Sequence, residues 1–198
     1  MDAGTPSGWV TRWAHLIAPG ASVLDVASGS GRHAGWLAAR GHAVLAVDRD
    51  ADALASMSAL PDIATLCADL EGAPWPLAGG RTFGAVVVTR YLHRPLFTHL
   101  IHALAPGGAL IYETFAAGNQ TVGKPSNPAF LLEPGELLEA VRGRLRVIAY
   151  EDGFVDAPHP AFVQRICAVL VPEPAKAGAI EDTTGNTPSG WPRYELTG

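Results

Sequence analysis

Short apolar runs recur along the chain, and each is bounded by glycine, proline or charged residues. Runs of this length are typical of strands buried on both faces of a parallel sheet. The pattern predicts seven strands, at residues 22–26, 43–48, 63–68, 83–89, 108–115, 145–151 and 161–171. Helical stretches alternate with these strands, so we expect an α/β fold with a doubly wound, mostly parallel sheet and helices on both faces.

Two helices have recognisable boundaries in the sequence. Residues 6–18 are predicted to form the first helix, with Ser7 as its N-cap and Trp9 and Trp13 on its apolar face. Residues 95–105 are predicted to form a later helix, because a proline opens the stretch and a Pro-Gly-Gly sequence ends it. The first helix therefore precedes the first strand, and the later one connects the fourth strand to the fifth.

The segment 116–133 lacks the periodicity of a helix or a strand. It contains Gly118, Asn119, Gly123 and Pro125, which favour turns. It leaves the carboxyl end of the fifth predicted strand, the edge at which open parallel sheets bind ligands. We expect a long ordered loop that covers a substrate pocket, and a surface connection without function is the alternative.

Length and composition indicate one domain followed by a tail. With 198 residues, of which 48% are hydrophobic and 17% charged, the chain suits a single globular core. We assign residues 1–172 to this domain. Residues 173–198 are rich in proline and glycine and are predicted to be a tail, which docks on the domain through Trp191 to Tyr194.

Charge and cysteine content exclude several classes of protein. The net charge of −5 argues against a nucleic-acid partner, because phosphate binding needs a basic surface. No apolar run approaches the roughly 18 residues of a membrane span, so we expect no membrane association and a cytoplasmic location. Cys67 and Cys167 are too few for a disulfide framework, and both fall in predicted strands, where buried thiols are expected.

Residues 23–33 carry the clearest chemical signal. Asp25 lies near the end of an apolar strand, and Gly29 and Gly31 follow it. Glycines allow the backbone to turn sharply from a strand into a helix, whose first N–H groups are free to bind a ligand. Asp48 ends the next predicted strand, 19 residues after Gly29. That offset is close to the roughly 20 residues at which an acid meets ribose hydroxyls in dinucleotide folds.

Three acids distinguish this pattern from a simple dinucleotide site. The stretch from Gly29 to Ala34 also fits a loosened dinucleotide fingerprint. A pyrophosphate gains nothing from the carboxylate of Asp25, however, whereas an ammonium group does. Asp69 follows a third apolar run, where it is placed to accept from an adenine amino group. Together with Asp48, these acids fit a ligand with a cationic amino acid, a ribose and an adenine.

With these features the chain resembles the class I S-adenosylmethionine-dependent methyltransferases, from about residue 10 to residue 171. Within that family it is most similar to compact bacterial enzymes of the tellurite-resistance-like group. The matching pieces are residues 25–31, Asp48, Asp69, residues 86–93 and residues 104–111. The resemblance implies S-adenosyl-L-methionine as the cofactor and S-adenosyl-L-homocysteine as its product. It also implies a last strand that runs antiparallel and a helix at 6–18 that lids the cofactor.

The resemblance further implies a set of cofactor-binding residues at the carboxyl edge of the sheet. They are Asp25, Ala27, Ser28, Gly29, Gly31, His33, Asp48, Arg49, Asp69, Leu70, Thr89 and Arg90. One of them departs from the family pattern, because Ala27 stands where the family has a glycine. Alanine resists the positive φ that such a turn requires.

Methyl transfer chiefly needs a nucleophile held in line with an activated methyl group in a dry pocket. If the acceptor must lose a proton, His93 and Glu113 are the candidate bases, and Tyr91 is a candidate for orienting the acceptor. Each also has a structural interpretation. His93 caps the next helix, Glu113 pairs with a nearby arginine, or Tyr91 packs over an adenosine.

The acceptor is inferred from motifs that the sequence lacks. Residues 89–92 read Thr-Arg-Tyr-Leu instead of the Asn/Asp-Pro-Pro-Tyr motif of amino-methylating enzymes, and neither cysteine follows a proline after the fourth strand. A small molecule is therefore the expected acceptor. No metal site is expected, because His99 and His102 have no third ligand at suitable spacing. Two alternatives stay open: an NAD(P)-dependent oxidoreductase and a non-catalytic S-adenosylmethionine-binding protein. The sequence does not determine the oligomeric state.

Overall fold

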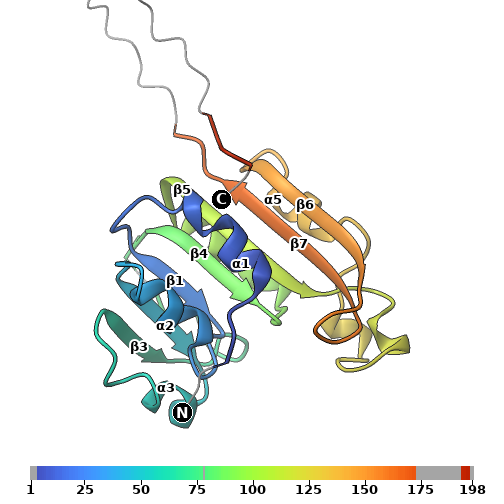
Figure 1. The fold of residues 1–198 in the computed structure, drawn as a ribbon, viewed down its shortest axis with the longest axis horizontal. Coiled ribbons are helices and arrows are strands. Elements are labelled where there is room, and N and C mark those ends of the chain that lie inside the picture. The colour runs from blue at the N-terminus through green and yellow to red at the C-terminus, as the bar shows by residue number, and fades with distance from the viewer. Residues whose placement is uncertain (1–3, 78, 173–192, 197–198) are drawn as a thin grey trace, which may run out of the picture.

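The computed structural model describes residues 4–77, 79–172 and 193–196. Its centre is one seven-stranded sheet (Figure 1). The strands in chain order are β1 (Val23–Val26), β2 (Val44–Asp48), β3 (Ile63–Cys67), β4 (Phe83–Thr89), β5 (Leu104–Phe115), β6 (Arg146–Val155) and β7 (Ala161–Val169). Their order across the sheet is β3-β2-β1-β4-β5-β7-β6.

The direction of the strands confirms the predicted topology. Strands β1 to β5 pair in parallel, and β7 pairs antiparallel with both β5 and β6. The order reverses beside β1, where the chain first builds β2 and β3 and then returns to β4. In open α/β sheets the crevice at such a switch point, outside the carboxyl ends of the strands, binds the ligand.

Helices cover both faces of the sheet, as the sequence predicts. They are α1 (Gly8–Trp13), α2 (Arg32–Ala38), α3 (Ala51–Ala55), α4 (Phe97–His102) and α5 (Glu136–Val141), with short 3-10 turns η1 (Ala14–Leu16), η2 (Arg94–Leu96), η3 (Asn119–Thr121) and η4 (Pro128–Phe130). Buried side chains of α1, α2 and α3 pack on one face of the sheet, and those of α4 and α5 pack on the other. Because side chains alternate between the two faces along each strand, the sheet has a separate hydrophobic core on each face.

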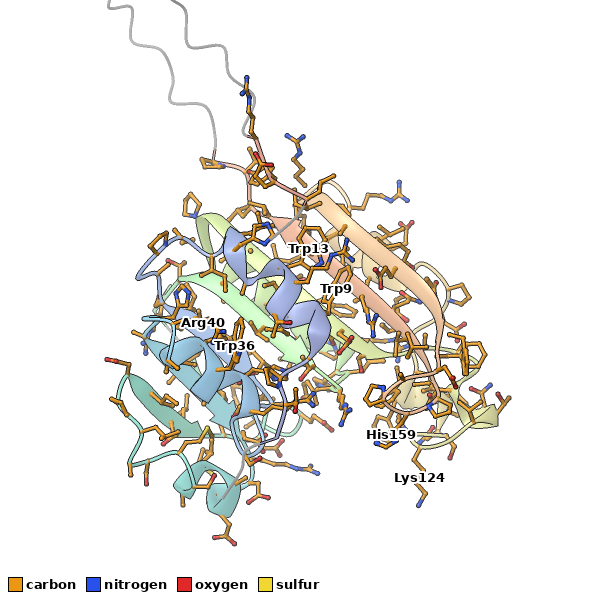
Figure 2. The ribbon with its side chains drawn as sticks, viewed as in Figure 1. Trp9, Trp13, Trp36, Arg40, Lys124 and His159 are labelled. Atoms are coloured by element: carbon orange, nitrogen blue, oxygen red, sulfur yellow. The ribbon has the colours of Figure 1, made fainter. Side chains whose placement is uncertain are left out.

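The first helix is shorter than residues 6–18, because a 3-10 turn replaces its last part. Ser7 is its N-cap, as predicted, and its hydroxyl accepts from the backbone N–H of Trp9 at 3.1 Å. Trp9 and Trp13 are buried against the sheet (Figure 2), and the indole of Trp9 donates to the carbonyl of Ile166 in β7 at 3.2 Å. This anchor fixes α1 across β5 and β7.

The helix predicted at 95–105 also ends early, and β5 begins at Leu104 instead of residue 108. A Cβ on Gly108 would lie 2.9 Å from the carbonyl oxygen of Phe83 and 2.8 Å from that of Ala105. The Pro-Gly-Gly stretch is therefore part of the strand, and its glycine is required because the backbones approach each other closely there. Sequence pattern alone does not reveal such an approach.

The loop at 116–133 is ordered and contains the 3-10 turns η3 and η4. Arg94 holds its far end, donating to Glu136 at 2.7 Å and to the carbonyls of Ala129 and Leu131, both at 2.9 Å. Figure 1 shows this loop, drawn in yellow, beyond the carboxyl end of β5. The loop therefore lies at the ligand-binding edge.

Two further predictions meet different outcomes. Cys167 is buried as expected, but Cys67 is exposed, because β3 is an edge strand with one poorly covered face. Trp191, through which the tail was predicted to dock, lies outside the described residues. Tyr194 packs against the α1 side of the core, and the guanidinium of Arg146 lies 5.4 Å from its ring centroid.

Candidate active site

The turn after β1 is built from residues in the left-handed region. Gly29 and Gly31 have φ values of +53° and +79°, and Ala27 adopts +53° although it carries a side chain. The strain at Ala27 costs about 1 kcal/mol, and such strain concentrates at functional sites. The turn therefore has the shape of the glycine-rich family motif despite the substitution at residue 27.

Asp25 lies beneath this turn and is 1% exposed. Burial raises the pKa of its carboxyl group to about 7, although the backbone N–H of Ala34 and the charge of Arg32 oppose the shift. Within the described chain, its Oδ2 atom is buried and has no hydrogen-bond partner. A buried carboxylate oxygen without a partner is costly for the fold, and a ligand cation would remove that cost.

Asp48 closes the other side of the turn. Its two carboxylate oxygens accept from the backbone N–H groups of Gly29, at 2.7 Å, and Asp50, at 2.9 Å. Asp69 is held in a similar way, because it accepts from the N–H of Glu71 at 2.9 Å. Backbone N–H groups of Glu71 and Gly72 lower the pKa of Asp69, so this carboxylate stays ionised. Both acids are thus fixed acceptors.

A cavity of about 190 Å³ lies between these two acids, and we call it the nucleoside cavity. It is lined by Ala27, Asp48, Arg49, Ala68, Asp69, Leu70, Glu71 and Tyr91. Five of these are in the predicted cofactor-binding set. The structure thus brings together residues from the ends of β1, β2, β3 and β4, as the predicted sheet edge requires.

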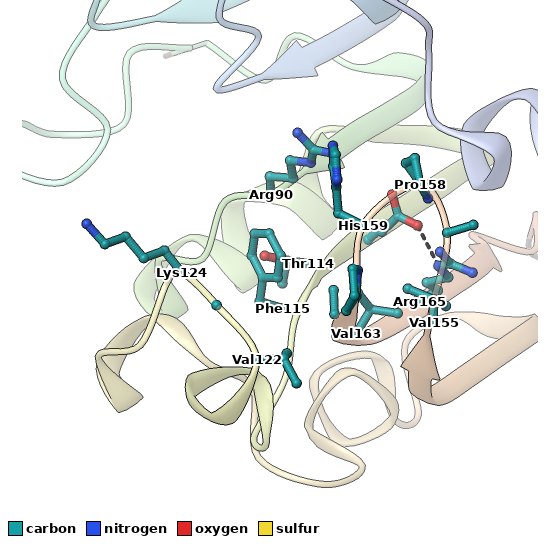
Figure 3. A pocket seen from close by; sticks show the side chains of 15 residues that line it. Arg90, Thr114, Phe115, Val122, Lys124, Val155, Pro158, His159, Val163 and Arg165 are labelled. Atoms are coloured by element: carbon teal, nitrogen blue, oxygen red, sulfur yellow. Dashed lines mark ion pairs between the residues drawn. The ribbon is translucent and has the colours of Figure 1, made fainter.

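A larger cavity of about 380 Å³ lies beside the ends of β5 and β7 (Figure 3), and we call it the β5–β7 cavity. Strand β5 contributes Glu113, Thr114 and Phe115 to its wall. A third cavity, of about 360 Å³, shares Arg90 with the β5–β7 cavity and Tyr91 with the nucleoside cavity. These three cavities form a continuous series along the carboxyl edge of the sheet.

Glu113 lies between the sheet and the start of α1, with 9% of its surface exposed. One carboxylate oxygen accepts from the hydroxyl of Ser7 at 2.8 Å, and the other forms an ion pair with Arg165 of β7. Arg165 also pairs with Glu151 at 3.1 Å. The partner expected for Glu113 was Arg90 or Arg94, but the structure supplies Arg165 from the neighbouring antiparallel strand.

Residues 23–108 match the family model described as a methyltransferase domain. That span runs from the start of β1 to the beginning of β5 and includes the glycine-rich turn and all the residues of the nucleoside cavity. Over these residues the chain is similar to the methyltransferase family.

Solved structures share the fold of this chain. TehB from Haemophilus influenzae superposes with a TM-score of 0.65 at 19% identity, over 79% of this chain and 59% of that one. A TehB-like S-adenosylmethionine-dependent methyltransferase from Corynebacterium glutamicum gives 0.57 at 21% identity, over 81% and 86%. The glycopeptide N-methyltransferase MtfA, complexed with S-adenosyl-L-homocysteine, gives 0.56 at 18% identity, over 79% and 86%. No curated protein matches the sequence.

His33 is tied to protein groups through both ring nitrogens. Its Nε2 accepts from the backbone N–H of Ser7 at 3.1 Å, which leaves the proton on Nδ1, facing the hydroxyl of Thr89 at 3.4 Å. Burial, followed by the charges of Arg32 and Arg90, lowers the pKa of His33 to about 3. The imidazole is therefore neutral, and Arg32 is the cation beside the turn.

The depressed pKa predicts an acid-sensitive fold that His33→Gln relieves. Below the ordinary pKa of 6.5 the unfolded chain takes up a proton that the folded protein does not, so stability falls as pH falls. A glutamine keeps an acceptor for Ser7 without titrating. We expect the variant to gain about 2 kcal/mol relative to the wild type on going from about pH 7 to pH 5. Urea unfolding at both pH values measures this, and equal losses in the two proteins would contradict it.

The structure separates the three predicted catalytic residues. Glu113 lines the β5–β7 cavity, whereas Tyr91 lines the nucleoside cavity and the third cavity. His93 lines none of the three, and its charge acts on Asp69. It occupies the N-cap of η2 but makes no side-chain capping bond. Burial and the nearby charge of Glu71 raise the pKa of Tyr91, so its phenol stays protonated.

Four residues of the candidate site were not foreseen in these roles. They are Ser7, which bridges His33 and Glu113, Arg165, which pairs with Glu113, and Lys124 and His159, which line the β5–β7 cavity. All four come from the ends of the domain or from the loop at 116–133. The antiparallel pairing of β5 with β7 places Arg165 directly opposite Glu113. The antiparallel last strand, which the family resemblance implied, was the signal that could have pointed to this pair.

Proposed function

We propose that the chain transfers a methyl group from S-adenosylmethionine to a small-molecule acceptor. The observation that carries this proposal is the series of three cavities along the carboxyl edge of the sheet. One end is lined by the acids suited to a nucleoside, and the other opens beside β5 and β7. An acceptor in the β5–β7 cavity would lie next to the cofactor rather than across the sheet from it.

The residues of the edge fit the parts of the cofactor. We assign Asp48 to the ribose hydroxyls and Asp69 to the adenine amino group, because both carboxylates are fixed and face the nucleoside cavity. We assign Asp25 to the ammonium group, directly or through one water, because its free oxygen lacks a cationic partner. The turn at residues 27–31 supplies the close backbone approach. Leu70 lines the nucleoside cavity with Asp48 and Asp69, whereas Ser28, His33 and Thr89 line none of the three cavities.

Bound S-adenosylmethionine supplies a methyl group already activated by the sulfonium. The chain then has to hold the acceptor in line and exclude water. Both oxygens of Glu113 are engaged by Ser7 and Arg165, so we assign this carboxylate to ordering the cavity wall instead of taking a proton. Tyr91 stays protonated and is assigned as a hydrogen-bond donor between the two sites.

Calorimetric titration tests the cofactor assignment. We expect S-adenosylmethionine and S-adenosylhomocysteine to bind with micromolar dissociation constants and NADH to give no signal. Because NADH lacks an ammonium group, it cannot use Asp25. Binding of NADH in place of the two sulfur compounds would overturn the proposal. The titration uses the full chain, including the residues of the tail.

A labelling experiment tests the acceptor class and separates catalysis from mere binding. The chain is incubated with methyl-labelled S-adenosylmethionine and a cell extract divided by ultrafiltration into small-molecule and macromolecular fractions. We expect label to be transferred in the small-molecule fraction. Label confined to macromolecules would contradict a small-molecule acceptor, and its absence from both fractions would favour a binding protein.

The location and the partners of the protein are predicted from the sequence. In the part of the chain that the structure covers, no helix is long and apolar enough to cross a membrane. A cytoplasmic location and the lack of a nucleic-acid partner stay predictions from the sequence. The lid role of the helix at 6–18 also stays a prediction, because residues 6–18 line none of the three cavities.

A further inference from the structure

The β5–β7 cavity carries more positive than negative charge. Its charged lining residues are Arg90, Lys124, Arg165 and Glu113, with His159 as a further polar group. Glu113 is neutralised by Arg165. Among the described residues, neither Arg90 nor Lys124 has a carboxylate within ion-pair distance. Two cations thus remain uncompensated at one cavity of a chain whose net charge is −5.

Arg90, Lys124 and the polar His159 come from three separate elements. Arg90 follows β4, Lys124 belongs to the loop at 116–133, and His159 belongs to the hairpin between β6 and β7. Figure 3 shows Arg90 and His159 at the cavity, and Lys124 at its edge with its side chain extending away from Arg90. Surface cations normally spread apart and are solvated, so two of them in the lining of one cavity favour an anionic ligand.

Arg90 is placed there by an unusual backbone conformation. Its φ is +55°, a value that a residue with a long side chain adopts rarely. Its N–H continues the sheet by donating to the carbonyl of Glu113 at 2.9 Å. The left-handed conformation of Arg90 follows this last hydrogen bond between β4 and β5. Arg90 lines both the β5–β7 cavity and the third cavity. Strain at a cavity wall is expected where side-chain direction matters.

The remaining walls of the cavity are largely apolar. Phe115, Val155 and Val163 line it from the strands, and Val122 lines it from the loop. Val122 is 42% exposed, and Phe130, which lines the third cavity, is 49% exposed. Exposed apolar side chains that gather at a cavity favour a ligand with an apolar body.

We infer that the methyl acceptor is an organic anion, a carboxylate on a carbon skeleton, whose negative group lies against Arg90, with Lys124 at the edge of the cavity as the second cation. The skeleton then covers Phe115 and Val122. This inference rests on the proposed function, because it concerns the acceptor of the same site. It narrows the acceptor from any small molecule to a class defined by charge and apolar surface.

The test begins with the complex of the full chain with S-adenosylhomocysteine. That complex is titrated calorimetrically with hexanoate, octanoate and phenylacetate, and with the primary amide of each. We expect at least one carboxylate to bind about tenfold more tightly than its amide, because charge-assisted hydrogen bonds exceed neutral ones by that much. We expect the difference to shrink at high salt, because the cations are exposed.

Variants identify the cations responsible. Lys124→Gln is expected to weaken carboxylate binding about three- to tenfold and to leave amide binding and S-adenosylhomocysteine binding unchanged. Lys124→Arg should retain carboxylate binding. Arg40→Gln is the matched control, because Arg40 stacks on Trp36 at 3.5 Å and lies far from Lys124 in Figure 2. It removes the same charge from the chain.

Each result has a defined meaning. Equal affinity for carboxylates and amides, or no binding of any carboxylate to the complex, would overturn the inference while leaving the proposed function intact. If sulfate or phosphate competes as strongly as the carboxylates, the site binds an anion without an apolar body, and the inferred carbon skeleton of the acceptor would be wrong. Failure of S-adenosylhomocysteine to bind in the first titration would instead overturn the proposed function, and this inference with it.

Discussion

Asp25→Asn is expected to weaken S-adenosylmethionine binding by about 10- to 100-fold and, at about pH 8, to stabilise the unliganded fold. The binding loss follows from the assignment of Asp25 to the cofactor's ammonium group, since a hydrogen bond between charged groups is replaced by a neutral one. The gain in stability follows from the burial of the carboxylate, whose Oδ2 atom has no hydrogen-bond partner among the described residues.

The sign of the stability change depends on pH. In the folded state the pKa of Asp25 is raised from 3.8 to about 7, so between these values the folded protein holds a proton that the unfolded chain has lost. The free energy of unfolding therefore falls as pH rises through this window. Above it, the wild type carries the full cost of the buried charge, on the order of 2–4 kcal/mol, and asparagine does not.

Urea unfolding at about pH 8 and pH 5, with calorimetric titration of the cofactor, checks both effects. At the lower pH the wild-type side chain is protonated in the folded state, so the difference in stability between the two proteins should narrow. Asp62→Asn is the control, because Asp62 is exposed, precedes β3 and lies at the opposite edge of the sheet. Unchanged cofactor affinity in Asp25→Asn would refute the assignment of Asp25.

Gly31→Ala is expected to destabilise the fold by about 2–4 kcal/mol. A Cβ at this position would lie 1.7 Å from the sulfur of Met57 and 2.6 Å from its Cγ. Met57 is itself 1% exposed in the core beneath α2 and α3, so it cannot move aside freely. The alanine would also have to adopt a φ of +79°.

Gly29→Ala separates the cost of the positive φ from the cost of a steric clash with Met57. Gly29 also has a positive φ, but a Cβ there would meet nothing within 4 Å. We expect this variant to lose only about 1 kcal/mol, comparable to the strain that Ala27 already bears. Urea unfolding of both variants measures the difference, and equal losses would show that Met57 does not restrict position 31.

The sheet edge was predictable because it depends on local patterns. Asp25, Asp48 and Asp69 each follow an apolar run, and parallel strands bring their carboxyl ends to one edge whatever the details of packing. The left-handed turn was predictable from Gly29 and Gly31 for the same reason. The sequence did not predict that Ala27 adopts the same conformation, because alanine rarely takes a positive φ.

The acceptor side was less predictable, because it is made of residues far apart in the sequence. Glu113 and Arg165 meet through the antiparallel pairing of β5 and β7. Lys124 and His159 reach one cavity from two different loops. His93, by contrast, follows β4 as the pattern indicated, yet lines none of the cavities. Position along a strand sets the edge on which a side chain lies, but loop geometry sets its neighbours.

The sequence by itself determined the α/β architecture, the antiparallel last strand through family resemblance, and the position of three acids at the carboxyl edge of the sheet. These depend on periodicity and on the residues that end each strand. Only the tertiary structure decided the pKa of Asp25 and of His33, the partners of Glu113 and the cations of the β5–β7 cavity. Those properties depend on burial and on contacts between distant segments, and a linear pattern contains neither.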